Sequence, residues 1–141
     1  MSLSGILSLW NQSKEFKEII EIIKGKLINK ILLSGLKDSA RSFFIAALVS
    51  KEEIKKSYLI ITDSQENALK IYQDLDTFLS KSQNKEENIF LFPSFDVLPY
   101  EDISSDPQII QQRINILKHL SMSGNGQDKK RIILITDIKA L

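Results

Sequence analysis

The chain contains no cysteine, a single histidine and no long hydrophobic run, and each shortage excludes a class of function. Without cysteine it forms no disulfide, cysteine-ligated zinc site or thiol nucleophile, a composition that fits a reducing compartment. No run approaches the roughly 20 apolar residues that cross a bilayer. Because the amino terminus also lacks the basic start and apolar core of a secretory signal, we expect a cytoplasmic location.

An excess of charge of either sign is also missing. There are 19 basic and 18 acidic side chains, which leave a net charge of +1. A domain that holds duplex DNA through phosphates usually has a basic excess or stripe. The strongest basic run, Lys129–Arg131, directly precedes an apolar segment, and we interpret it as the solvated start of a strand. Strong nucleic-acid binding by this chain alone is therefore not expected, and neither is membrane binding.

The 141 residues, 43% of them hydrophobic, are enough for one ordinary domain. Apolar residues at helical spacing predict helices over residues 13–24, 39–50, 63–79 and 106–120. Continuous apolar runs predict strands over residues 30–34, 58–61, 89–92 and 131–136. This alternation predicts an α/β fold, a parallel sheet in three layers with helices on both faces. We expect a single domain over residues 1–141, with 1–12 as a flexible or tag-derived start.

A degenerate phosphate loop lies between the first expected strand and its helix, where open α/β sheets gather ligands. A phosphate-binding loop requires Gly, four residues, then Gly, Lys and Ser or Thr. Gly35 and Ser42 stand at the right spacing, but Ala40 replaces the second glycine and Arg41 replaces the lysine. We interpret the fold as RecA-like, related to P-loop NTPases, with a loop retained for packing.

Each departure from the loop pattern works against nucleotide binding. A Cβ at Ala40 obstructs the close approach of the backbone to phosphate. The planar fork of Arg41 replaces a compact ammonium. Asp38 places a negative charge inside an anion loop, where like charges about 4 Å apart repel by roughly 4 kcal/mol before screening. A working ATP site is the alternative, and a weak anion site at the helix start stays open.

Two aspartates follow expected strands, at the ends where an ATPase holds magnesium. Asp63 and Asp137 also lie where helix caps are expected, and we predict that they cap. A further acidic group consists of Glu101, Asp102 and Asp106. With one histidine in the chain and no regular ligand spacing, we expect no metal site there.

A family resemblance covers nearly the whole chain from about Phe16 onward. It rests on the loop Leu32–Ser42, on Asn67–Leu69 in the second helix and on Thr136–Leu141 at the end. It also rests on a proline–tyrosine stretch and the helix after it, in particular Pro93, Pro99, Tyr100, Asp106 and Arg113. In this order the segments resemble the transcription-repair coupling factors (Mfd) of bacteria, whose first segment is a decayed phosphate loop.

The resemblance implies that this chain is the first part of an amino-terminal module. That module is similar to the nucleotide-excision protein UvrB but has lost its ATPase motifs. The vestigial loop would consist of Gly35, Lys37, Asp38, Ser39, Ala40, Arg41 and Ser42. Lys37 and Asp38 occupy positions where relatives commonly have small residues. No catalytic residue, cofactor or metal ligand carries over to this chain.

For the full-length protein the resemblance implies a larger activity. Such factors recognise and displace stalled RNA polymerase, move along duplex DNA with ATP and magnesium in a downstream motor, and recruit UvrA. This chain would be a non-catalytic scaffold domain that packs against neighbouring domains of the same polypeptide. The alternative is an active small P-loop ATPase or a helicase fragment.

Overall fold

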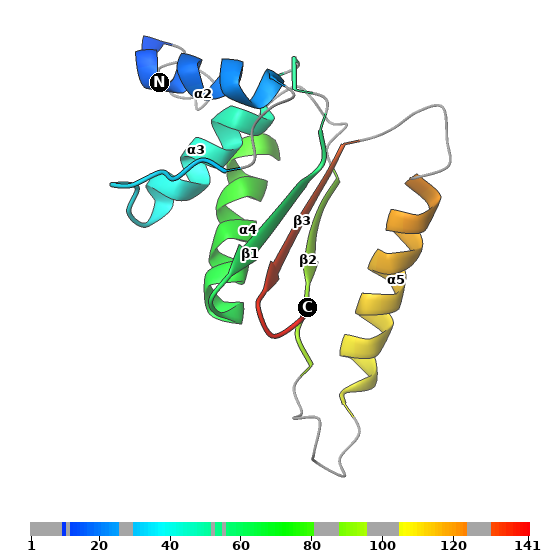
Figure 1. Ribbon diagram of the computed structural model, residues 1–141. Helices are drawn as coiled ribbons and strands as arrows, with labels where there is room; N and C mark the ends of the chain where they lie inside the picture. Colours follow the sequence, from blue (N-terminus) through cyan, green and yellow to red (C-terminus); the bar gives the residue numbers. More distant parts are fainter. Residues whose placement is uncertain are drawn as a thin grey trace. The chain divides into compact units, whose positions relative to one another are not determined.

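A computed structural model describes residues 10, 12–25, 30–51, 53–54, 56–80, 88–95, 105–123 and 131–141. The elements follow one another as α2 (Lys14–Lys24), α3 (Ser39–Val49), β1 (Tyr58–Thr62), α4 (Gln65–Ser80), β2 (Asn88–Phe92), α5 (Pro107–Ser123) and β3 (Ile132–Asp137) (Figure 1). They form two compact units. One comprises Met1–Lys55 and Gln73–Lys85, the other Lys56–Tyr72 and Glu86–Leu141. No helix within the described ranges is long and apolar enough to cross a membrane.

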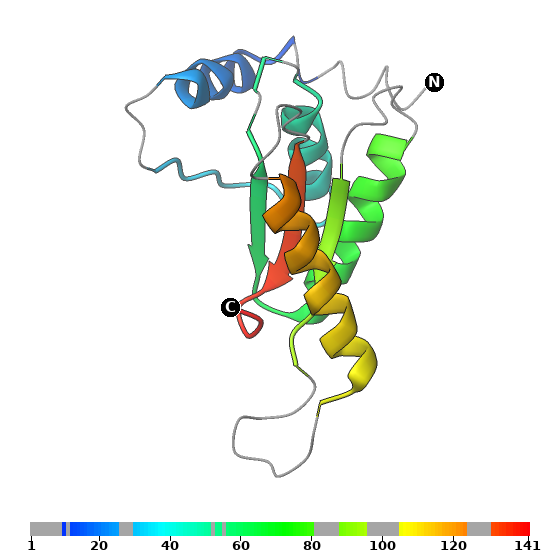
Figure 2. The same ribbon diagram turned by 90° about the vertical axis from the view of Figure 1, so that its right-hand side faces the viewer.

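The second unit contains a sheet of three parallel strands in the order β1-β3-β2. The central strand β3 pairs with both neighbours, for example Ile135 with Ile60 and Leu134 with Phe90. Figure 2 shows α5 crossing one face of this sheet, while the first turns of α4 lie on the opposite face. The prediction of a small α/β protein with a parallel sheet is therefore confirmed.

The strand predicted over residues 30–34 is wrong. Within the described residues this segment pairs with no strand, and it has no regular secondary structure. Leu32 is 87% exposed, and Ile31 and Leu33 are 38% and 42% exposed. An apolar run favours a strand only when a partner strand can satisfy its backbone groups, which sequence does not reveal. The degenerate loop thus follows an extended, exposed segment.

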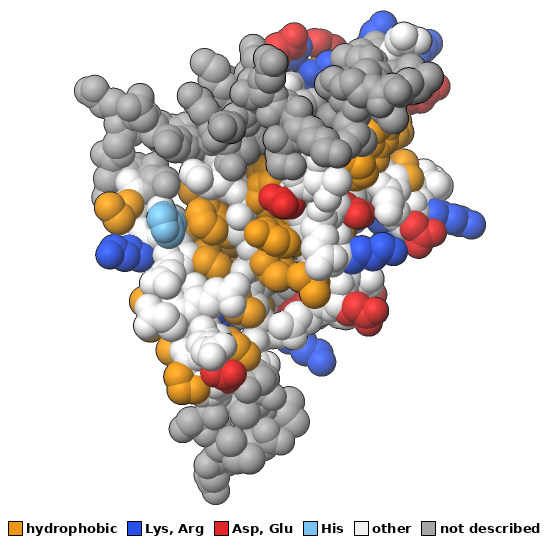
Figure 3. Space-filling view, turned by 180° about the vertical axis from the view of Figure 1, so that it is seen from behind, with side chains coloured by type: hydrophobic (Ala, Val, Ile, Leu, Met, Phe, Trp, Pro, Cys, Tyr) orange, Lys and Arg blue, Asp and Glu red, His pale blue; other side chains and the backbone are white. Residues whose placement is uncertain are grey.

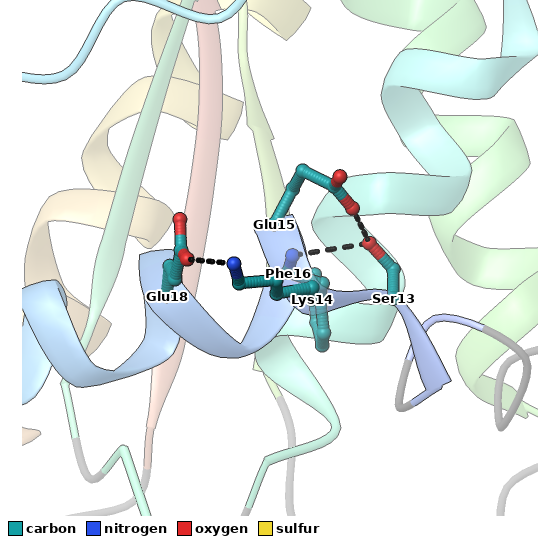
Figure 4. A network of polar contacts seen from close by, with 5 residues as sticks. All are labelled: Ser13, Lys14, Glu15, Phe16 and Glu18. Carbon is teal, nitrogen blue, oxygen red and sulfur yellow. Dashed lines mark hydrogen bonds and ion pairs between the residues drawn. The ribbon is translucent and has the colours of Figure 1, made fainter.

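The boundaries of α2 agree with the prediction. Figure 4 shows that the Ser13 hydroxyl accepts a hydrogen bond from the Phe16 N–H at 3.2 Å and donates one to Glu15 at 2.6 Å. Lys14 lies 3.9 Å from Glu18 on the outer surface of the helix. The last helical residue is Lys24, and the Gly25 N–H that follows donates to the Glu21 carbonyl at 3.0 Å.

The cap of α4 lies one residue later than predicted. The Ser64 hydroxyl, and not the Asp63 carboxylate, accepts from the Asn67 N–H, at 3.3 Å. Asp63 instead accepts a hydrogen bond from the Asn67 side chain at 2.7 Å. Serine caps helices as well as aspartate does, so the prediction of Asp63 missed the adjacent Ser64. Neither hydrogen bond requires a metal ion.

The residues directly after Asp137 form a turn. The Asp137 carboxylate accepts from the N–H groups of Lys139 at 2.8 Å and Ala140 at 3.0 Å, as a helix-capping residue does. The predicted capping role of Asp137 is therefore confirmed, at the turn that follows β3.

Aromatic rings form the core of the first unit. Phe16 of α2 packs edge-to-face on Phe44 of α3, with their ring centroids 5.6 Å apart. The ring centroids of Phe43 and of Phe78 in α4 are 5.5 Å apart. Trp10 contacts Phe44 at 5.4 Å and Phe16 at 5.6 Å. Trp10 lies within the start segment 1–12, most of which lies outside the described residues. Edge-to-face pairs of this kind stabilise a core beyond simple area burial.

Candidate functional site

The degenerate loop contains two residues in left-handed backbone conformations. Gly35 has φ +85°, which glycine adopts without cost. Asp38 has φ +46° and occupies the position before α3, but its side chain makes no capping hydrogen bond there. A left-handed conformation at a residue with a Cβ costs roughly 1–2 kcal/mol. The loop therefore carries backbone strain that no side-chain cap offsets.

Backbone N–H groups of the loop are engaged within the loop itself. The Ala40 N–H donates to the Lys37 carbonyl at 3.0 Å, and the Arg41 N–H donates to the Asp38 carbonyl at 3.1 Å. In a functional phosphate loop such N–H groups point at the anion. The two positions that depart from the phosphate-loop pattern thus also use their N–H groups for a local turn.

The two loop side chains that would contact phosphate and magnesium, Arg41 and Ser42, are engaged or buried. The Arg41 Nε donates to the Leu36 carbonyl at 3.0 Å. Ser42, whose hydroxyl would hold magnesium in an active site, is only 1% exposed. A pocket of about 500 Å³ beside the loop is lined by Leu33, Ser34, Gly35, Leu36, Arg41, Phe44 and Ile45. This lining is largely apolar, and Arg41 is its one charged side chain.

A second cluster lies in the sheet unit, where the carboxyl ends of β2 and β3 meet α5. The Arg113 guanidinium lies 4.1 Å from the ring centres of both Phe92 and Phe95. Its nitrogens donate to the carbonyls of Pro93 at 2.5 Å and Ala140 at 3.3 Å. Cation–π contacts use the planar face of the guanidinium, and hydrogen bonds to carbonyls use the N–H groups at its edge. Arg113 therefore joins three separate segments of the unit.

The charge of Arg113 lies partly out of water. Burial lowers the pKa of its guanidinium, and the nearby Asp137 carboxylate opposes this by raising it. Arginine stays protonated despite such a shift because its ordinary pKa lies far above neutral pH. The cluster is thus a fixed positive charge beside a buried negative one.

Asp137 is 2% exposed and is fully engaged in hydrogen bonds. The Ser94 hydroxyl donates to one carboxylate oxygen at 3.0 Å, while the other oxygen accepts the two N–H groups of the following turn. A buried carboxylate is tolerated when its oxygens are satisfied in this way. The geometry is that of a structural cap. Within the described ranges, no three His, Asp or Glu side chains gather closely enough to hold a metal ion.

The structure brings together only part of the proline–tyrosine stretch. Pro93 and Arg113 are in contact through the hydrogen bond described above. Asp106 caps α5, since its carboxylate accepts from the Gln108 N–H at 2.8 Å. Pro99 and Tyr100 lie outside the described residues.

Sequence reasoning did not single out Phe92, Ser94 or Phe95 as members of this cluster. The sequence signal for this cluster was weak. The spacing of Phe92 and Phe95 at the end of a strand indicates a cluster only once Arg113 is known to lie against both rings.

The fold and both clusters define a small α/β protein with a parallel sheet and a turn resembling a degenerate phosphate loop. Comparison with known proteins relates it to the transcription-repair coupling factors. The chain is 32% identical over 83 residues to the transcription-repair-coupling factor of Rickettsia bellii, and the aligned residues cover 59% of this chain. It is 29% identical over 125 residues to that of Bacillus subtilis, covering 89% of this chain, and 30% identical over 98 residues to that of Rickettsia conorii, covering 70%.

These matches confirm the family resemblance, but they concern only a small part of each relative. The chain spans 7% of the Rickettsia bellii protein, 8% of the Rickettsia conorii protein and 10% of the Bacillus subtilis protein. No family model matches the chain. No solved structure matches it significantly.

Proposed function

We propose that this chain is a non-catalytic scaffold region of a transcription-repair coupling factor, with a RecA-like, UvrB-like fold. The observation that carries the proposal is the hydrogen bonding of the degenerate loop. The N–H groups of Ala40 and Arg41 and the Arg41 side chain all bind carbonyls of the loop itself. The match to coupling factors supplies the biological setting.

Several features of this loop oppose the binding of a triphosphate. It would compete with the two backbone hydrogen bonds and would meet the Asp38 carboxylate within the turn. Its magnesium ion would need a hydroxyl at Ser42, which is buried. Each of these changes would make nucleotide binding less favourable than it is in a functional phosphate loop, whose N–H groups are free to bind the anion.

The scaffold role assigned to this chain is to hold neighbouring domains in place. Arg113 and Asp137 fix the carboxyl ends of the strands, the side of the sheet where a catalytic relative would bind its ligand. In the full-length protein, ATP and magnesium act in a separate motor. The partners are UvrA, RNA polymerase and duplex DNA, in the cytoplasm.

Isothermal titration of the chain with magnesium and ATP tests this proposal. We expect no binding at micromolar strength for the wild type. The double variant Ala40→Gly, Arg41→Lys should gain measurable binding, because it restores the second glycine and the lysine of the pattern. Arg131→Lys, outside the loop, is the matched control and should behave as wild type.

Micromolar binding by the wild type contradicts the proposal. If the wild type also hydrolyses ATP and Arg41→Ala abolishes the hydrolysis, the chain is an active small P-loop ATPase or helicase fragment.

A further inference from the structure

The outer edge of β2 borders a groove that shares no residue with the loop from Gly35 to Ser42 and has no part in the proposed scaffold role. The groove has a volume of about 720 Å³, and residues of β2, of α5 and Tyr72 of α4 line it. Figure 3 shows this side of the molecule, where hydrophobic side chains are exposed next to the histidine. Among the described residues no strand pairs with this edge, since β2 pairs only with β3.

The backbone of β2 presents hydrogen-bonding groups to the groove. The Asn88 N–H donates to the Arg131 carbonyl at 3.3 Å and therefore points toward β3. In a parallel ladder, alternate residues direct their backbone groups to opposite sides. Ile89 and Leu91 consequently direct their N–H and C=O groups away from β3, toward the open edge.

A side-chain amide already occupies one of these groups. The Gln112 Nε2 of α5 donates to the Leu91 carbonyl at 3.3 Å, where the N–H of an additional strand would stand. This bond is long, and its donor lies on an exposed side chain, so a peptide N–H could replace it at little cost.

Most of the side chains that α5 contributes to the groove are uncharged amides, beside Pro107, Ile116 and His119. Gln108, Gln111 and Asn115 line it together with Gln112, and no lysine, arginine, aspartate or glutamate does. Gln111 and Asn115 also bind each other at 3.0 Å. Carboxamides donate and accept hydrogen bonds at once, as peptide groups do. A charged side chain placed here would lose water without gaining an ion pair.

The two sides of the groove differ in polarity. The Phe90 ring lies 5.5 Å from the His119 ring of α5, so Phe90 points to the α5 face. Ile89 and Leu91 point to the other face, because successive side chains of a strand alternate. A strand added at this edge would meet amides on the α5 side and the apolar side chains of Ile89 and Leu91 on the other.

We propose that the outer edge of β2 binds an extended, uncharged polypeptide segment as a fourth strand. Its side chains alternate between apolar residues, beside Ile89 and Leu91, and uncharged polar residues, beside the amides of α5. Main-chain hydrogen bonds to Ile89 and Leu91 provide affinity, and the alternation provides specificity, as in other cases of strand addition.

Nuclear magnetic resonance of the 141-residue chain tests the proposal with a capped heptapeptide of alternating valine and threonine as the probe. We expect saturable amide shifts at Ile89, Leu91 and the first half of α5. A peptide with the same composition but consecutive valines should bind about tenfold more weakly. A peptide N-methylated at alternate residues, which lacks the donor N–H groups, should be weakened by a similar factor of about ten.

Matched variants locate the site. Gln111→Glu keeps the side-chain length but adds a charge in the groove, and should weaken the probe about fivefold or more. Gln73→Glu makes the same change on the exposed surface of α4 and should have no effect. Asn115→Asp serves as a second groove variant if thermal melting shows that Gln111→Glu unfolds the chain.

Three outcomes overturn the proposal. One is the absence of amide shifts up to millimolar peptide. Another is equal binding of the N-methylated or consecutive-valine peptide, which would indicate non-specific apolar contact. The last is sedimentation of the free chain as a dimer that Gln111→Glu dissociates, which would assign this edge to a second copy of the chain.

Discussion

Asp38 is a residue whose backbone conformation conflicts with its side chain. At φ +46° its Cβ is crowded, and its carboxylate caps nothing. Asp38→Gly should raise the free energy of unfolding by about 1 kcal/mol, because glycine removes this strain at a modest cost in unfolded-state entropy. Urea denaturation measures the change. Lys37→Gly, one residue earlier where φ is not positive, should not stabilise the chain, and equal stabilisation by both would show that Asp38 is unstrained.

Arg113 holds its neighbours through shape as well as charge. Arg113→Ala removes two hydrogen bonds and both ring contacts and should lower the free energy of unfolding by about 2 kcal/mol. Arg113→Lys should recover less than half of the loss, because an ammonium cannot stack and bridge in the same way. Chemical denaturation measures both. Lys118→Ala on the exposed part of α5 is the control, and a loss as large as that of Arg113→Ala would refute the special role of Arg113.

At the scale of elements, α2 depends on its serine cap. The Ser13 hydroxyl, which donates to Glu15, is the main cause that holds the pKa of that carboxyl below its ordinary 4.5. The lowered pKa means that this contact stabilises the fold above the ordinary pKa and is lost as the pH falls through the folded value.

Ser13→Ala should therefore raise the pKa of Glu15 and weaken α2 by about 1 kcal/mol. Carboxyl-detected titration reports the pKa, and hydrogen exchange at the Phe16 amide reports the cap. Ser121→Ala, near the end of α5, should leave both values unchanged. An unchanged pKa for Glu15 in Ser13→Ala would mean that the hydroxyl contact does not form in solution.

All four predicted helices formed, whereas one of the four predicted strands did not. Capping residues and apolar spacing are local signals, so α2, α3 and α5 were predicted to within a few residues. The run over residues 30–34 failed because strand formation depends on a distant partner. The predicted cap Asp63 was wrong because Ser64, an equally good capping residue, follows it directly.

For the molecule as a whole, alternation predicted a parallel sheet but could not give the order β1-β3-β2. Loop spacing located the segment from Gly35 to Ser42, whereas the bond from Arg41 to Leu36 could not be foreseen. Arg113 and Pro93 were chosen by resemblance. Their contact and the buried pair of Ser94 and Asp137 arise from tertiary packing, which no local pattern encodes.

The near-zero net charge leads to an expectation about DNA. With 19 basic and 18 acidic residues, the chain lacks the excess of cations that phosphate contacts require. An electrophoretic shift assay should detect no tight duplex complex at moderate salt. A complex that survives moderate salt would reveal a local basic surface and would place DNA binding within this region.

The central claim is that the turn between Gly35 and Ser42 does not hold a triphosphate. The amide resonances of Gly35, Ala40 and Arg41 report on it directly during titration with magnesium and ATP. We expect these signals to stay in place up to millimolar nucleotide, since two of the N–H groups are engaged by loop carbonyls. Saturable shifts of all three amides at micromolar ATP, removed by Arg41→Ala, would contradict the account.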